Sequence, residues 1–169
     1  MKIPKALITL AICVLSVTIL YAVNISKVEA QPTTDCRKLV TGTYLTTNSG
    51  NFGTFRGILT LSQDGNFFAS ASNQSRDALV PPYGHIQGSW KCTSSREITV
   101  TTLDFIYPTA TSPGAIGRTD TTATFEPKNG IVQATSKVRS FDLNANPLVD
   151  NGMVLGTFTF TGQRVKPGQ

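Results

Sequence analysis

His85 is the residue of this chain best suited to proton transfer, and it is the only histidine. It follows Tyr83 closely, and two further residues with ionisable side chains, Asp104 and Tyr107, end a later hydrophobic segment. A histidine beside such groups can act as a general base. No serine or cysteine nucleophile in an elbow motif accompanies it, so we assign no catalytic residue and favour a structural or surface role for His85.

Residues that bind metals are sparse. The chain has no C-x-x-C pair and a single histidine, so the usual ligands of a zinc site are missing. The segment 142–146 begins like a calcium loop, which places oxygen donors at alternate positions. Pro147 stands where such a loop needs glycine, and Met153 stands where it needs glutamate. We therefore predict no metal site and no cofactor, and an ordinary hairpin loop at this segment.

Aromatic residues, together with His85, form a third set of candidates. They could contact a small hydrophobic or amphipathic ligand inside a cavity, or they could pack together as a solid core. Both alternatives remain open from the sequence. The candidate ligand-binding residues are Phe55, Phe67, Tyr83, His85, Trp90, Phe105, Tyr107, Phe158 and Phe160.

Cys36 and Cys92 are the two cysteines that follow the hydrophobic N-terminal segment, which contains the third, Cys13. A pair of cysteines in an oxidising compartment usually forms one disulfide. We predict a Cys36–Cys92 bridge, with two buried free thiols as the alternative.

The segments that must position these residues are all predicted to be β-strands. Thr, Val, Ile and Phe alternate with polar residues, Gly, Pro and Asn mark the breaks, and no amphipathic helix of useful length is evident. We predict an all-β domain of eight strands. Their ranges are 42–47, 53–61, 66–72, 85–93, 97–107, 116–126, 131–141 and 154–165.

The lengths of the connections predict how these strands are arranged. If each strand reverses the one before it, the short turns 62–65, 93–96 and 127–130 lie at one end, and every long loop lies at the other. That distribution is typical of an eight-stranded antiparallel up-and-down β-barrel with a closed floor and a loop-fringed mouth, which leaves no sheet edge exposed.

The first and last strands carry short motifs that resemble those of lipocalin-like (calycin) barrels. Gly42-Thr43-Tyr44 resembles the opening Gly-x-Trp, with Tyr in place of Trp, and Arg164 resembles the terminal basic residue that packs on that ring. The segment 84–90, which ends in Trp90, and Asp64-Gly65 are similar to pieces of small exported bacterial proteins with a lipocalin-like pattern. The resemblance implies a barrel with a cavity for a small apolar molecule and implies no catalytic residues.

The N-terminus has the features of an export signal. Lys2 and Lys5 precede an apolar run over residues 6–23, and Val28-Glu29-Ala30 fits a signal peptidase site. We predict a signal peptide over 1–30, a single β-barrel domain over 31–169, and a secreted or periplasmic location. A retained membrane anchor is the alternative, because the run of 18 residues is long enough to cross a bilayer.

Cleavage after Ala30 would leave twelve basic and nine acidic residues, a net charge of +3. No basic stripe with interleaved aromatic residues stands out, so we expect no nucleic-acid partner. We expect membrane contact only through the signal segment before cleavage, and the sequence indicates no oligomeric state. The preferred function is binding of a small apolar ligand. A barrel enzyme of the cyclase or isomerase type and a solid-cored structural or adhesion module are the alternatives.

Overall fold

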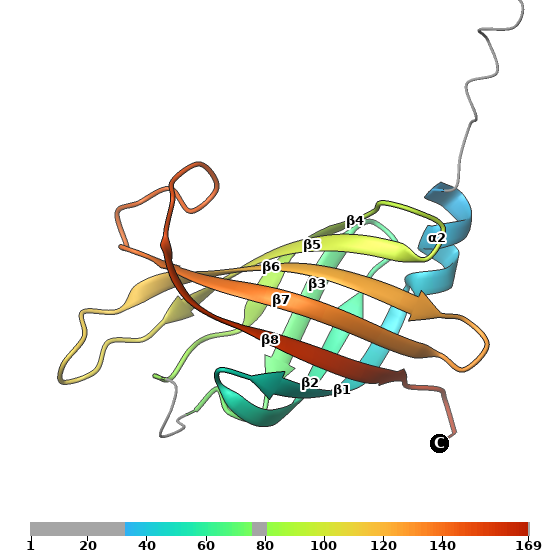
Figure 1. The fold of residues 1–169 in the computed structure, drawn as a ribbon, viewed down its shortest axis with the longest axis horizontal. Helices are drawn as coiled ribbons and strands as arrows, with labels where there is room; N and C mark the ends of the chain where they lie inside the picture. The colour runs from blue at the N-terminus through green and yellow to red at the C-terminus, as the bar shows by residue number, and fades with distance from the viewer. Residues whose placement is uncertain (1–32, 76–80, 169) are drawn as a thin grey trace, which may run out of the picture. The chain divides into compact units, whose positions relative to one another are not determined.

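A computed structural model describes residues 33–75 and 81–168, which form one short helix followed by eight strands (Figure 1). The predicted signal peptide over 1–30 lies outside these residues. The elements are α2 (Thr33–Val40), β1 (Gly42–Gly50), β2 (Gly53–Leu61), β3 (Asn66–Ala71), β4 (Ile86–Cys92), β5 (Glu97–Ile106), β6 (Ala115–Glu126), β7 (Ile131–Phe141) and β8 (Met153–Arg164).

The eight strands form a closed antiparallel barrel in which each strand pairs with its neighbours in the chain. β8 closes the sheet on β1, with a register that runs from Tyr44↔Arg164 to Gly50↔Phe158. The predicted up-and-down barrel is therefore confirmed, including the pairing of the first strand with the last. The main difference in strand bounds is that β1 continues to Gly50, because its last residues pair with both β2 and β8.

The two ends of the barrel differ as the connection lengths predicted. The short turns after β2, β4 and β6 lie at the same end as α2, which we call the floor (Figure 1). Two of these turns contain a glycine with positive φ, Gly65 at 96° and Gly130 at 66°, a conformation that residues with a Cβ rarely adopt. The long connections after β3, β5 and β7 lie at the opposite end, which we call the mouth.

The floor half of the barrel is filled by side chains. Alternate residues along each strand point inward, and near the floor these are mostly large and apolar. Their burial supplies the main hydrophobic stabilisation of the fold. The packed residues include Tyr44, Leu61, Trp90, Ile98, Val100, Phe125 and Val132.

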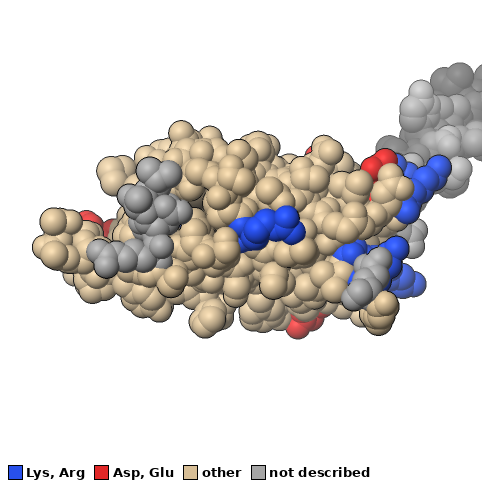
Figure 2. All heavy atoms as spheres, turned by 90° about the horizontal axis from the view of Figure 1, so that it is seen from below, with Lys and Arg blue, Asp and Glu red and all other residues tan. Residues whose placement is uncertain are grey.

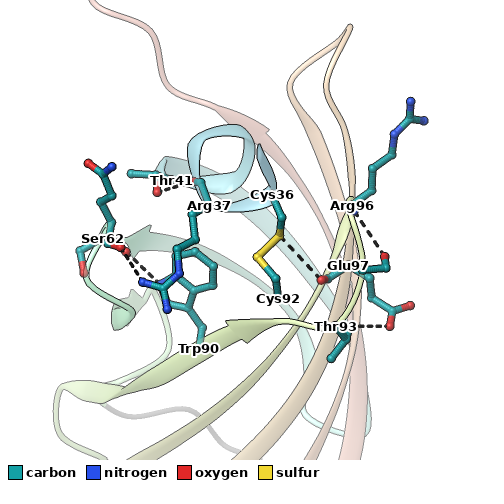
Figure 3. Close-up of a disulfide and its surroundings, with 11 residues drawn as sticks. Cys36, Arg37, Thr41, Ser62, Trp90, Cys92, Thr93, Arg96 and Glu97 are labelled. Atoms are coloured by element: carbon teal, nitrogen blue, oxygen red, sulfur yellow. Dashed lines mark hydrogen bonds between the residues drawn. A yellow bond between two sulfur atoms is a disulfide. The ribbon is translucent and has the colours of Figure 1, made fainter. Parts of the chain in front are cut away.

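The helix α2 was not predicted from the sequence, and it covers the floor. It has only eight residues, and isolated helices of this length are marginal in water, so its hydrophobic pattern gave little signal. Tertiary contacts stabilise it instead: Cys36 and Val40 are fully buried, and the Cys36–Cys92 disulfide joins the helix to β4 (Figure 3). The predicted disulfide is confirmed, and it ties the N-terminal segment across the floor.

The first and last strands also meet at the floor through the contact that the lipocalin-like motifs implied. The Arg164 guanidinium lies 5.4 Å from the centre of the Tyr44 ring, and it donates hydrogen bonds to the carbonyls of Leu39 and Thr41. The Tyr44 hydroxyl donates to the Val40 carbonyl at 2.8 Å. These contacts fix the C-terminal end of α2 against the barrel, in an arrangement consistent with a lipocalin-like fold.

Candidate functional site

The mouth half of the barrel contains a cavity of about 460 Å³. It lies above the packed floor half and reaches the mouth loops, where Phe52, Pro81, Tyr83 and Ser112 line it. Its volume falls in the range of sites that hold one drug-sized molecule. The barrel is therefore solid at the floor and hollow at the mouth.

One side of this cavity is aromatic. Four residues from β8, β2 and the connection between β1 and β2 form a phenylalanine cluster, consisting of Phe52, Phe55, Phe158 and Phe160. The Phe158 ring is at its centre, with ring-centroid distances of 6.3 Å to Phe52, 5.8 Å to Phe55 and 6.4 Å to Phe160. Edge-on rings at these separations offer both faces and edges to an apolar ligand.

Strands β5, β6 and β7 contribute a wall of small polar side chains, which begins beside the phenylalanine cluster where Ser136 pairs with Phe158. Inward-facing residues of these strands carry hydroxyl groups, and some of them hydrogen-bond within the wall. Thr121 and Ser136 lie 2.8 Å apart between their hydroxyl oxygens, and the Thr102 hydroxyl donates to the Thr119 carbonyl. The small inward-facing side chains of β7 also line the cavity, namely Ser136, Val138 and Ser140.

Asp104 is the one charged side chain among the described residues that line the cavity. It lies on β5 opposite Gly117 of β6, which presents no side chain, and it forms no ion pair or hydrogen bond with another described residue. Burial raises the pKa of Asp104 to about 6, because desolvation disfavours the charged form. The carboxylate is therefore placed in the cavity without a partner among the residues that the structure describes.

Tyr83 faces the same region and is held by the segment between β3 and β4. Its amide donates to the Gln74 carbonyl at 3.0 Å, and its hydroxyl donates to the Asn73 side-chain oxygen at 2.7 Å. Burial and the nearby Asp104 charge both raise the pKa of Tyr83, so the phenol stays protonated. Because its proton is directed to Asn73, Tyr83 does not neutralise the carboxylate.

The structure brings five of the nine aromatic and histidine candidates together in the cavity. These five are Phe55, Phe67, Tyr83, Phe158 and Phe160. Two parts of the cavity are not among the residues expected from the sequence: the threonines of the polar wall, and Asn48, a buried residue of β1 that hydrogen-bonds Thr46 and the Phe55 carbonyl. Strand alternation places Thr102 and Asp104 on the same inward face of β5 as Ile98 and Val100. This alternation is the sequence signal that identifies Thr102 and Asp104 as inward-facing.

The other four candidates do not line the cavity. Phe105 points outward from β5 and is 61% exposed, because its strand position has the opposite parity to Asp104. Tyr107 and His85 are also exposed at the mouth. Trp90 points inward but lies at the floor, where its indole nitrogen donates to the Ser62 carbonyl and Arg37 lies over its ring (Figure 3).

A β-bulge changes which residues of β8 face the cavity. Continuous alternation along β8 would place Val154 on the same face as Phe158 and Leu155 on the other face. The pairing with β7 shifts between Val138 and Arg139, so that Val138 pairs with Gly156 and Arg139 with Val154. As a result Leu155 lines the cavity, and Val154 is half exposed.

Within the described residues, no group of three or more His, Cys, Asp and Glu side chains is placed to hold a metal ion. None of the described helical segments has the length and apolar character to cross a membrane.

Comparisons of the chain with protein-family models, with curated proteins and with solved structures gave no match.

The partly buried Asp104 carboxylate predicts that Asp104→Asn makes the protein more stable at neutral pH. Between about pH 4 and about pH 6 the folded state keeps a proton that the unfolded state has lost, so stability decreases as the pH rises through this window. Folding raises the pKa of Asp104 by about two units, and the partial exposure of this side chain reduces the corresponding energy. Above this window we therefore expect Asp104→Asn to raise the free energy of unfolding by about 2 kcal/mol.

Urea unfolding at about pH 7.5 and about pH 4 measures this effect. The Asp104→Asn protein should exceed the wild type in stability only at the higher pH. Asp142→Asn, which changes an exposed aspartate of the loop between β7 and β8, should change the stability little at either pH. Equal stability of the Asp104→Asn and wild-type proteins at both pH values would contradict the prediction.

Proposed function

We propose that this protein is an exported lipocalin-like barrel that binds one small hydrophobic or amphipathic molecule in the cavity at its mouth. The observation that carries the proposal is the cavity itself, which is lined by a phenylalanine cluster together with small polar side chains. A solid-cored structural module is expected to have side chains that fill both halves of the barrel. Large apolar side chains on β6 and β7 would stabilise such a module better than Thr119, Thr121 and Ser136.

The division of the barrel into two halves supports binding at one end only. The floor is sealed by α2, the Cys36–Cys92 disulfide and the Arg164–Tyr44 contact, so a ligand can enter only between the mouth loops. A rigid closed end also keeps the cavity formed in the absence of ligand, which lowers the entropic cost of binding.

The disulfide also supports an exported protein, since such bridges persist in oxidising compartments outside the cytoplasm. A barrel enzyme using His85 is the weaker reading, because the exposed His85 side chain lies outside the cavity and would not touch a substrate bound there.

Filling the cavity tests the proposal. Thr119 belongs to the polar wall, so Thr119→Trp places a large ring inside the cavity. Because this ring occupies the volume of the ligand, it should weaken binding of the fluorescent apolar reporter N-phenylnaphthylamine at least roughly tenfold. Thr122→Trp makes the same change on the exposed face of β6 and should leave reporter affinity unchanged.

Fluorescence titration of the purified proteins measures both affinities, and circular dichroism checks that each variant keeps its strand content. Reporter binding that resists Thr119→Trp, or that Thr122→Trp weakens equally, would locate the binding surface outside the barrel and overturn the proposal.

A further inference from the structure

The charge inside the cavity indicates what kind of ligand fits it. Asp104 is the only charged side chain among the described residues that line the cavity, and none of the described residues supplies a cation to pair with it. A buried charge without a partner costs stability unless something else neutralises it. A ligand with a positive charge would supply the missing partner.

The surroundings of Asp104 leave this role to the ligand. On β6, Gly117 lies directly opposite Asp104, and the apolar Ile86 of β4 lines the same cavity. Tyr83, from the segment after β3, also lines it, but its hydroxyl proton is donated to Asn73. Among the described residues of these elements, Tyr83 is thus the only other titratable group that faces Asp104. The Arg118 and Arg139 guanidinium groups both pair with Asp120 on the outer face of the sheet.

The distribution of charge along the barrel favours the approach of a cation to the mouth. The described parts of the mouth connections contain Asp142 and Asp150 and neither Lys nor Arg. The floor carries the opposite sign, and Figure 2 shows Lys and Arg gathered mainly at that end of the face in view. The basic floor residues include Arg37, Lys38, Arg96, Lys128 and Lys166. Such asymmetry steers a cationic ligand toward the acidic end.

We propose that the ligand is an amphipathic amine, with its ammonium group against the Asp104 carboxylate and its apolar body against the phenylalanine cluster. This inference rests on the proposed ligand-binding function and narrows it to one chemical class. The raised pKa of Asp104 is consistent with a site that is incomplete until a cation binds.

Three matched compounds separate charge from shape. Phenylbutylamine, phenylbutanol and phenylbutyrate share one apolar body and carry a positive, a neutral and a negative head group near neutral pH. In calorimetric titrations of the purified protein we expect the amine to bind roughly tenfold to a hundredfold tighter than the alcohol, because it gains a charge-assisted hydrogen bond. The carboxylate should bind most weakly.

Asp104→Asn keeps the shape of the side chain and removes its charge. It should weaken amine binding roughly tenfold or more and leave alcohol binding unchanged. Asp142→Asn, an exposed aspartate at the same end of the barrel, is the matched control and should leave both affinities unchanged. Amine affinity of the wild type should also fall below about pH 6, where Asp104 gains a proton, while alcohol affinity stays constant.

The outcomes distinguish this inference from the proposed function. Equal affinity for the amine and the alcohol, or amine binding that survives Asp104→Asn, overturns the amine proposal while cavity binding stands. Failure of all three compounds and of the reporter to bind overturns cavity binding itself, and the amine proposal with it.

Discussion

Trp90→Ala is expected to lower the free energy of unfolding by about 3 to 5 kcal/mol, the usual cost of removing a large buried aromatic side chain. Trp90 is 4% exposed and packs in the floor core. The substitution also leaves the Ser62 carbonyl without the indole donor at 3.1 Å and removes the ring under Arg37. Urea unfolding followed by circular dichroism measures the change.

Two further variants show whether Trp90 acts on stability or on binding. Phe105→Ala removes an aromatic side chain from the exposed face of the neighbouring strand and should change stability by less than about 1 kcal/mol. Trp90→Phe keeps most of the floor packing and should bind the reporter with unchanged affinity, because Trp90 does not line the cavity. Weaker reporter binding by a folded Trp90→Phe protein would show that this residue belongs to the site after all.

Replacing both Cys36 and Cys92 with alanine is expected to lower the free energy of unfolding by about 3 to 4 kcal/mol. The two cysteines are 56 residues apart, and a cross-link over this separation restricts the unfolded chain strongly. The loss also releases α2 from β4, so the contacts of Val40 and Arg37 over the floor weaken with it.

The measurement is urea unfolding of the double variant beside the wild type with and without reductant. The reduced wild type and the double variant should have similar midpoints, both well below that of the oxidised protein. A midpoint that does not respond to reductant or to substitution would show that the bridge contributes nothing to stability. Reporter affinity extrapolated to the folded population should change little, because neither cysteine lines the cavity.

The two halves of the barrel have different physical tasks. The floor stabilises the fold through apolar packing, one disulfide and the hydrogen bonds that hold α2. The mouth contains features that reduce stability, namely an unfilled volume and the unpartnered Asp104. Such locally unfavourable features are expected at functional sites, where the ligand supplies the missing contacts.

The sequence alone determined the architecture of this protein. Alternating apolar and polar residues located all eight strands, and the short turns at 62–65, 93–96 and 127–130 placed the long loops together at the mouth. The pair of cysteines that follows the N-terminal segment predicted the disulfide, and the resemblance to lipocalin-like barrels implied the Arg164–Tyr44 contact. These features depend on local pattern and on chain order, which the sequence states directly.

Only the tertiary structure decided which inward-facing residues line the cavity and what charge it contains. Alternation fixes the side of a strand that a residue faces but not its depth in the barrel, so Trp90 at the floor and Phe160 in the cavity looked equivalent. The bulge in β8 reversed Val154 and Leu155, and α2 formed because the disulfide and the floor stabilise it. The isolation of Asp104 depends on what β4, β6 and Tyr83 place around it, and those neighbours are far apart in the chain.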